Sequence, residues 1–291
     1  MKYFPLTKGT FEHQFGIRAL RENESIIEVT DQYASETSLK QSLLERAPGE
    51  YFQALSGSSR AQRDVATMVL AALKSLPDAH RPPALATENL TIKNLATDDA
   101  PPLLSISRRV QEDLTILRND PANGFPLIAG CVCFPSGWCI ADKIGQNLMD
   151  VHLPVPEFAS ALADATNNLL QRLKVGRPVW RTNWGVRPSG QLDQSPQHRA
   201  YLDEQLSQVD AENAGQRCYF RVERQTLARL PSDGDILFAI HTHQQPLDML
   251  SLQEKQSLLG VIRSCPEPTL MYKGILPMRD AVTAYLQSEI H

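Results

Sequence analysis

The chain of 291 residues is 42% hydrophobic and 21% charged, and its formal net charge is −4. These values are typical of a globular protein with one large or two moderate domains. No run of Lys and Arg indicates a nucleic-acid surface, and no apolar segment reaches the roughly 18 residues of a membrane span. The first residues lack the apolar core of a signal peptide. The five cysteines are odd in number, so we expect free thiols and a cytoplasmic protein.

The first part of the chain is predicted to be mainly helical. Residues 31–46 and 60–76 have apolar side chains at helical spacing, and a proline follows each run closely. A Pro- and polar-rich stretch over 82–102 is predicted to be a long surface connection. Residues 105–118 are predicted to form a third helix, because their apolar side chains would make one buried stripe.

From residue 126 onward the pattern changes toward β-structure. Strands are expected on both sides of a turn at 135–137 within 126–140, and over 179–186, 218–227 and 236–243. Helices are expected over 142–149, 156–173, 199–208, 251–263 and 278–288. Successive hairpins favour an antiparallel sheet with helices packed on one side over a doubly wound parallel sheet. The sequence therefore predicts an α+β fold.

One expected strand carries charges that must be either paired or used. With a period of two, Arg221, Glu223 and Gln225 share one face, whereas Val222 and Arg224 share the other. Leaving such charges buried and unpaired would cost several kcal/mol. The segment therefore indicates either a structural Arg–Glu network or a functional carboxylate among guanidinium groups.

Four histidines are candidate metal ligands. His241 and His243 share one strand face and would form a metal pair or a simple strand-end pair, but no carboxylate lies at a spacing that completes a facial triad. His152 lies in a stiff, proline-flanked segment, and His198 lies in a polar loop. Each of these two suits either a metal ligand or a structural hydrogen bond.

The cysteines and tryptophans each allow a structural or a ligand-binding role. Cys131 and Cys133 form C-x-C rather than the C-x2-C of structural metal sites, so we predict inert, buried thiols. Trp180 and Trp184 share one strand face, as a core stripe or as the wall of a pocket for a flat ligand. The chain has no dinucleotide-binding glycine motif, no P-loop and no nucleophile elbow.

Several short motifs occur in an order that is typical of one family. They are Phe15-Gly16-Ile17-Arg18, Gln111-Glu112-Asp113-Leu114, Pro135-Ser136-Gly137-Trp138, Asp142-Lys143-Ile144-Gly145, His152-Leu153-Pro154-Val155-Pro156, Arg181-Thr182-Asn183-Trp184, Arg221–Leu227, Leu230-Pro231 and Tyr272-Lys273-Gly274. Through this combination the chain resembles the α-subunit-type family of heme-dependent oxidative N-demethylases, formerly a domain of unknown function. The resemblance covers almost the whole chain. His241-Thr242-His243 departs from the Arg-Thr-Tyr expected in relatives.

The resemblance implies a PAS-like heme-binding domain over residues 121–291, on which an N-terminal helical portion over 1–120 packs. It also implies heme b bound through a histidine, and oxidative removal of a methyl group from a small secondary amine such as dimethylamine, with dioxygen. Electrons would come from partner reductase subunits that carry flavin and an iron–sulfur cluster. This chain has no motif for either of those two cofactors.

The resemblance also suggests roles for individual residues. Glu223 would hold the ammonium group of the substrate and take its proton. His152 and His198 are the two candidates for the axial heme ligand, and the sequence does not decide between them. The expected cofactor-binding residues, with the arginines at the heme propionates, are Arg181, Trp184, Arg221 and Arg224.

Two other functional readings remain open. A non-catalytic PAS-like ligand-binding or sensory protein would hold heme, or another flat ligand, without turnover. A non-heme metal protein would use His241 and His243. The demethylase reading requires an open iron position beside Glu223 and a reductase partner, whereas the sensory reading requires neither.

Overall fold

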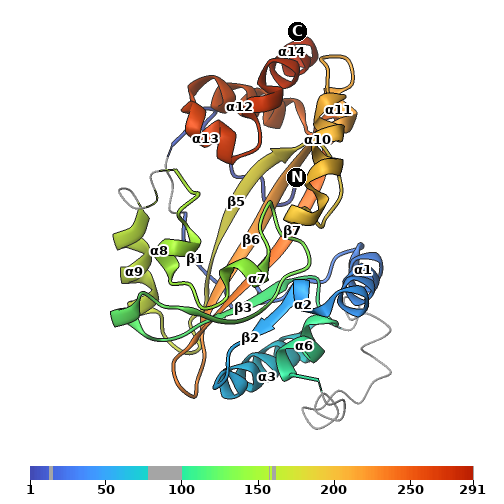
Figure 1. Ribbon diagram of the computed structural model, residues 1–291. Coiled ribbons are helices and arrows are strands. Elements are labelled where there is room, and N and C mark those ends of the chain that lie inside the picture. The colour runs from blue at the N-terminus through green and yellow to red at the C-terminus, as the bar shows by residue number, and fades with distance from the viewer. Residues whose placement is uncertain (13–15, 78–99, 157, 159–161, 291) are drawn as a thin grey trace.

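The computed structural model describes residues 1–12, 16–77, 100–156, 158 and 162–290, and its centre is one antiparallel sheet (Figure 1). The seven strands pair in the order β1-β5-β6-β7-β3-β4-β2. Their bounds are β1 Arg18–Ala19, β2 Phe52–Ala54, β3 Asp113–Leu117, β4 Leu127–Cys131, β5 Val179–Arg187, β6 Tyr219–Arg229 and β7 Ile236–Pro246. The prediction of an α+β fold with an antiparallel sheet is confirmed.

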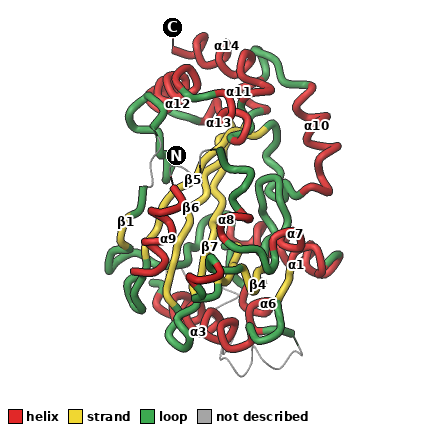
Figure 2. The backbone as a smooth tube through the Cα atoms, turned by 60° about the vertical axis from the view of Figure 1, so that its left-hand side comes forward, coloured by secondary structure: helices red, strands yellow, loops and turns green. Residues whose placement is uncertain are grey.

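Helices pack at both ends of the sheet (Figure 2). Near β2 and β4 lie α1 Tyr33–Arg46, α2 Pro48–Tyr51, α3 Ser59–Ser75 and α6 Pro102–Ser107, and at the far end lie α11 Ala214–Arg217, α12 Leu252–Ser264, α13 Glu267–Tyr272 and α14 Arg279–Ile290. The remaining helices are α7 Ile140–Lys143, α8 Leu148–Val151, α9 Ala163–Arg172 and α10 Arg199–Ser207. No described helix is long and apolar enough to cross a membrane.

Local sequence signals explain where the longer helices begin and which face they bury. In α12, the Ser251 hydroxyl and the Glu254 carboxylate form a capping box that satisfies the first free backbone N–H groups. In α3, Val65, Val69 and Leu73 recur at helical spacing and are almost completely buried in a core shared with β3 and β7. Both helices were predicted within two residues of their observed ends.

The predicted helix over 105–118 is wrong beyond Ser107. Helix α6 ends at Ser107, and residues 113–117 form β3 between β4 and β7. Every residue of β3 is buried. Apolar spacing alone does not separate a buried helix from a strand with two paired neighbours, and here the tertiary pairing overrides the helical period.

Other expected elements differ in extent. The strand predicted after the turn at 135–137 is replaced by α7, apart from an isolated bridge between Ser136 and Gln194. Most of the 82–102 stretch, Phe15 and part of the predicted 156–173 helix lie outside the described residues. Strands from both sides of residue 120 pair in the one sheet. The boundary between residues 1–120 and 121–291 stays a prediction.

Candidate functional site

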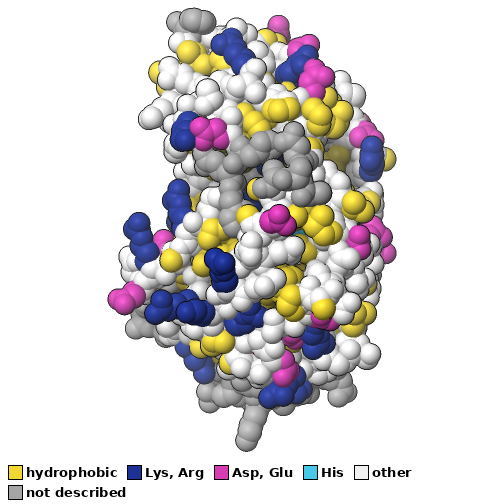
Figure 3. All heavy atoms as spheres, turned by 90° about the vertical axis from the view of Figure 1, so that its left-hand side faces the viewer, with side chains coloured by type: hydrophobic (Ala, Val, Ile, Leu, Met, Phe, Trp, Pro, Cys, Tyr) yellow, Lys and Arg dark blue, Asp and Glu magenta, His cyan; other side chains and the backbone are white. Residues whose placement is uncertain are grey.

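A cavity of about 580 Å³ lies against one face of β5, β6 and β7. Residues of α8, α9, α10 and α13 form its other walls. Its apolar floor includes Leu227, Phe238 and Ile240 from the sheet. Figure 3 views the side where α8 and α9 lie, and hydrophobic side chains gather across the middle of this face. A cavity of this size, with an apolar floor and polar groups gathered at one part, suits a small-molecule or cofactor ligand.

Strand register explains why polar groups gather at one part of the cavity. Asn183 of β5 pairs with Glu223 of β6, and Arg181 pairs with Gln225. Side chains two residues apart share a face, so these residues and Arg221 point to the same side. All five line the cavity. The predicted sharing of a face by Arg221, Glu223 and Gln225 is thus observed.

Glu223 is held by neutral hydrogen-bond donors. Ser136 Oγ donates to Glu223 Oε1 at 3.1 Å, while Asn183 Nδ2 and Gln225 Nε2 donate to Oε2 at 3.2 and 2.9 Å. Within the described part of the chain, no Lys or Arg forms an ion pair with this carboxylate. The alternative of a direct Arg–Glu network is therefore not what the structure shows. The negative charge is oriented, but a ligand cation is free to pair with it.

Arg221 is a buried guanidinium bound mainly by backbone carbonyls. Its Nη2 donates to the Phe134 and Leu192 oxygens at 2.6 and 3.1 Å, and its Nη1 lies 3.4 Å from Gln244 Oε1. Burial lowers its pKa to about 10, against the opposing charge of Glu223. Arg221 thus joins the turn after β4 to the loop before α10, and few of its donors remain for a ligand.

Arg224 lies on the opposite face of the sheet and does not line the cavity. Its Nη2 donates to the Ser25 oxygen at 2.7 Å, and its guanidinium lies over the rings of Tyr3 and Trp180. The structure therefore separates Arg224 from the other predicted cofactor-binding residues. Its orientation follows from the alternation of side chains along β6.

Arg187, which the sequence analysis did not single out, lines the cavity instead. Burial lowers the pKa of Arg187, and the negative charge of Glu223 opposes part of this shift. Among the described residues, none forms a hydrogen bond or ion pair with its guanidinium. Gly274 makes room for it, because a Cβ there would collide with Arg187 Nη1, and its φ of +76° favours glycine. Arg181 also lines the cavity, and burial lowers its pKa. Both arginines suit an anionic ligand group.

The two candidate heme ligands have different surroundings. His152 lines the cavity, stacks on Phe158 at 4.2 Å, and its Nδ1 donates to the Leu148 oxygen at 2.8 Å. This bond leaves the Nε2 lone pair for a metal, and burial lowers the pKa so that the ring is neutral. His198 does not line the cavity, and its Nε2 lies 3.0 Å from Asp193 Oδ2.

The two tryptophans of β5 lie in different surroundings, and the cysteines are free thiols. Trp184 lines the cavity and stacks on Phe220, whereas Trp180 packs edge-on against Tyr3 away from it. All five cysteines are free, and Cys131 and Cys133 are buried, as predicted.

Lys273 is a second functional residue that the sequence analysis missed, although it belongs to the motif Tyr272-Lys273-Gly274. Its Nζ donates to Asn183 Oδ1 at 2.7 Å and lies 5.1 Å from the Trp184 ring centroid. Burial, together with the charges of Arg181 and Arg187, lowers its pKa to about 7 against the opposing charge of Glu223. Near neutral pH both protonation states of this amine are therefore populated, one hydrogen bond away from the Glu223 network.

The lowered pKa of Lys273 predicts how the free energy of unfolding depends on pH. In the unfolded chain the pKa of Lys273 is near 10.5. The buried charge therefore lowers the free energy of unfolding by its full amount below pH 7, and by less as the pH rises toward 10.5. We expect Lys273→Met to raise the free energy of unfolding by a few kcal/mol at pH 6.5, and by progressively less toward pH 10. Urea unfolding of the heme-free chain across this range measures it. The exposed Lys174→Met variant is the control, and an equal difference at every pH would contradict the assignment.

The fold and the cavity define an α+β protein whose antiparallel sheet presents a carboxylate, several cations and a neutral imidazole to one ligand space. A family model described as haem-dependent oxidative N-demethylase, alpha subunit-like, matches residues 16–283 of the chain. The protein belongs to this family. Membership supports a heme-dependent, oxidative N-demethylase-like function.

Proposed function

We propose that the protein is a heme-binding oxidative N-demethylase subunit that oxidises a small secondary amine of the dimethylamine type with dioxygen. A partner reductase with flavin and an iron–sulfur cluster would supply the electrons. The observation that carries this proposal is Glu223, a carboxylate with no ion-pair partner among the described residues, which lines the same cavity as the neutral His152 imidazole. The free thiols support the proposed cytoplasmic location.

The residues present fit heme b. His152 would be the axial ligand, because its Nδ1–H is bonded to a backbone oxygen and its neutral Nε2 remains available. Arg187 and Arg181 would bind the propionates, with Arg221 adding positive charge, and Trp184 would lie in the wall of the slot. Heme bound in this way would supply the dioxygen and one-electron chemistry of amine oxidation.

Glu223 and Lys273 would control the protonation of the substrate amine. A secondary amine is cationic at neutral pH, so Glu223 would bind and orient it through a charge-assisted hydrogen bond. The amine must lose this proton before its nitrogen is oxidised, and a nearby group would take it. Lys273, with its pKa near 7, donates to Asn183, which in turn donates to Glu223, so the charge of Lys273 would tune how strongly Glu223 holds that proton.

A spectrum followed by a turnover assay tests the proposal. We expect the protein, expressed with a heme precursor, to show a Soret band that shifts when carbon monoxide is added after reduction by dithionite. Dimethylamine should then be demethylated, with formaldehyde as the other product, only when reductant and dioxygen are both present. A flat visible spectrum after reconstitution with hemin would overturn the demethylase proposal.

One observation favours a second candidate, a non-catalytic PAS-like ligand-binding or sensory protein. The central strands in the order β5-β6-β7-β3-β4, with a helical connection between β4 and β5, support a PAS-like sheet whose face holds the ligand. The chain itself also has no flavin or iron–sulfur motif from which electrons would come. A stable Soret band without amine turnover under any reductant would favour this candidate.

A further inference from the structure

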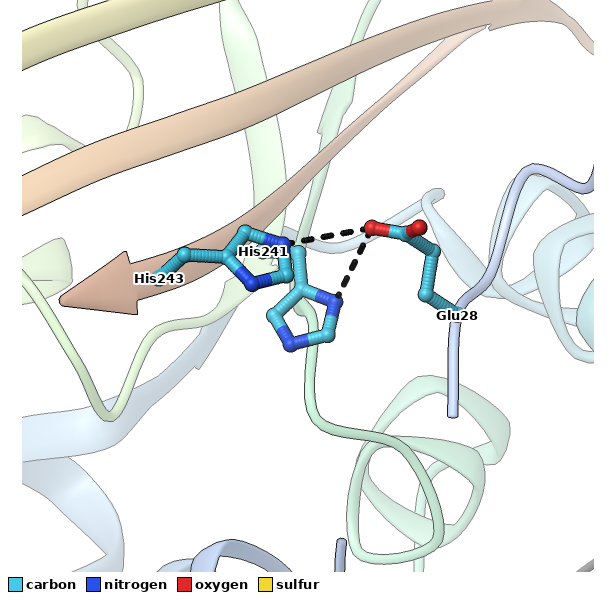
Figure 4. A group of neighbouring side chains, drawn as sticks. All are labelled: Glu28, His241 and His243. Carbon is cyan, nitrogen blue, oxygen red and sulfur yellow. Dashed lines mark hydrogen bonds and ion pairs between the residues drawn. The ribbon is translucent and has the colours of Figure 1, made fainter. Parts of the chain in front are cut away.

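A second cluster of ligand-type side chains lies on the face of the sheet opposite to the cavity. His241 and His243 project from one side of β7, and their rings stack with centroids 4.2 Å apart. Glu28 reaches them from the segment before α1 (Figure 4). Glu28 Oε2 lies 3.2 Å from His243 Nε2 and 3.6 Å from His241 Nδ1. The carboxylate that completes the histidine pair thus comes from a distant part of the sequence.

These spacings are those of ligands around one small metal ion. Metal–ligand distances of about 2.0–2.1 Å at tetrahedral angles separate neighbouring ligand atoms by roughly 3.3 Å. The three candidate atoms all lie within 4.8 Å of one another, and both contacts of Glu28 Oε2 are close to that spacing. At 3.6 Å, the contact between Glu28 Oε2 and His241 Nδ1 is too long for a hydrogen bond.

We propose that His241 Nδ1, His243 Nε2 and Glu28 Oε2 hold a divalent transition-metal ion of the zinc class. Two imidazoles and one carboxylate are a usual ligand set for such an ion, and the fourth position remains for another oxygen. The site is separate from the cavity and does not depend on the proposed heme.

Buried polar atoms around the three ligands point to the same ion. His241 is 1% exposed, and its Nδ1 has no hydrogen-bond partner within the described residues. Glu112 is also 1% exposed, its Oε1 lies 3.2 Å from that Nδ1, and its Oε2 lacks a hydrogen-bond partner in the same described set. Such unsatisfied buried groups are costly without a ligand. Glu112 is therefore placed to fill the fourth position or to bind a water on the ion.

Neighbouring side chains orient the ligands. Lys2 Nζ and the Tyr3 hydroxyl donate to Glu28 Oε1 at 2.6 and 2.5 Å, which turns Oε2 toward the histidines. On the far side of the His241 ring, Glu36 Oε2 lies 4.0 Å from Nε2. At this distance Glu36 acts on the ring through its charge and not through a direct hydrogen bond.

The charge balance also favours a cation here. Glu28, Glu36 and Glu112 surround His241, whereas the fixed positive groups nearest to Glu28 are Lys2 and Arg224, the latter at 3.8 Å. The three carboxylates make this mostly buried place favourable for a cation. A bound divalent ion would offset their negative charge and would tie the N-terminal segment to β7.

Metal analysis of the full-length, heme-loaded protein tests this site. After removal of metals with a chelator, the protein is dialysed against micromolar Zn²⁺, and zinc and iron are counted separately by mass spectrometry. We expect one zinc per chain, and a zinc-edge X-ray absorption spectrum with two imidazoles in the first shell. The melting temperature of the wild-type protein should rise with added Zn²⁺.

Two ligand variants and one control complete the test. His243→Asn and Glu28→Gln should each weaken Zn²⁺ binding by at least about 100-fold, because even an outer-shell partner is worth about 10–100-fold. The control His198→Asn should bind zinc like the wild type. No retained zinc in the wild-type protein, an absorption spectrum without imidazole ligands, or unchanged affinity in both variants would overturn the proposal.

Discussion

The replacement of His152 by alanine should abolish heme binding. Because Nδ1 of His152 donates to the Leu148 oxygen, the lone pair on Nε2 remains available for iron. The ring lies in the cavity wall. Loss of an outer-shell partner alone weakens metal binding about 10–100-fold, so loss of the ligand itself should cost more than about 100-fold in heme affinity. Hemin titration followed at the Soret band measures the change.

The His198→Ala variant is the matched control for this prediction. His198 bonds to Asp193 outside the cavity, so we expect its removal to leave the Soret band intact. Added imidazole should enter the space left in the His152→Ala variant and restore a Soret band. The reverse pattern, with heme lost only in His198→Ala, would show that the wrong histidine has been assigned.

The second large effect concerns Glu223. The Glu223→Gln variant keeps the size and much of the hydrogen bonding of the side chain but removes its charge, so heme should still bind. We expect turnover of dimethylamine to fall by about 10²–10⁴-fold, the usual contribution of a positioned acid–base group. The KM for the amine should also rise, because a buried cation loses its charge-assisted partner. Steady-state formaldehyde release and the Soret band are measured on the same preparation.

Two further variants separate charge from shape at this position. Glu223→Asp keeps the charge and should retain more activity than Glu223→Gln. The exposed Glu204→Gln variant on α10 makes the same chemical change away from the cavity and serves as the control. If Glu223→Gln turned over amine at the wild-type rate, Glu223 would not be the amine anchor, although heme binding would be unaffected.

Local patterns predicted the sheet and the faces of its strands well. The alternation along β6 places Glu223 with Arg221 and Gln225 and puts Arg224 on the other side, as the structure shows. This works because a two-residue period is a property of the extended backbone itself. The same kind of reasoning failed for β3, where burial on both faces removes the alternation that distinguishes a strand from a helix.

The partners of the candidate site were less predictable than its strands. The charges of Arg187 and Lys273 interact with Glu223, yet only the folded sheet and the approach of Gly274 to Arg187 bring them together. Arg221 looked like a ligand-binding arginine, but the carbonyls of Phe134 and Leu192 occupy its Nη2, and Nη1 lies near Gln244. Sequence shows which side chains a strand presents, but it does not show what lies opposite them.

By itself, the sequence determined the α+β class, the antiparallel strands β4 to β7, the buried thiols and, through its motifs, the family. Only the tertiary structure decided that His152 lines the cavity while His198 does not, and that Glu28 joins His243 across 215 residues of chain. The physical reason is the range of the interactions. Backbone geometry and apolar period act between near neighbours, whereas a site is assembled by packing and register between segments that are far apart in the chain.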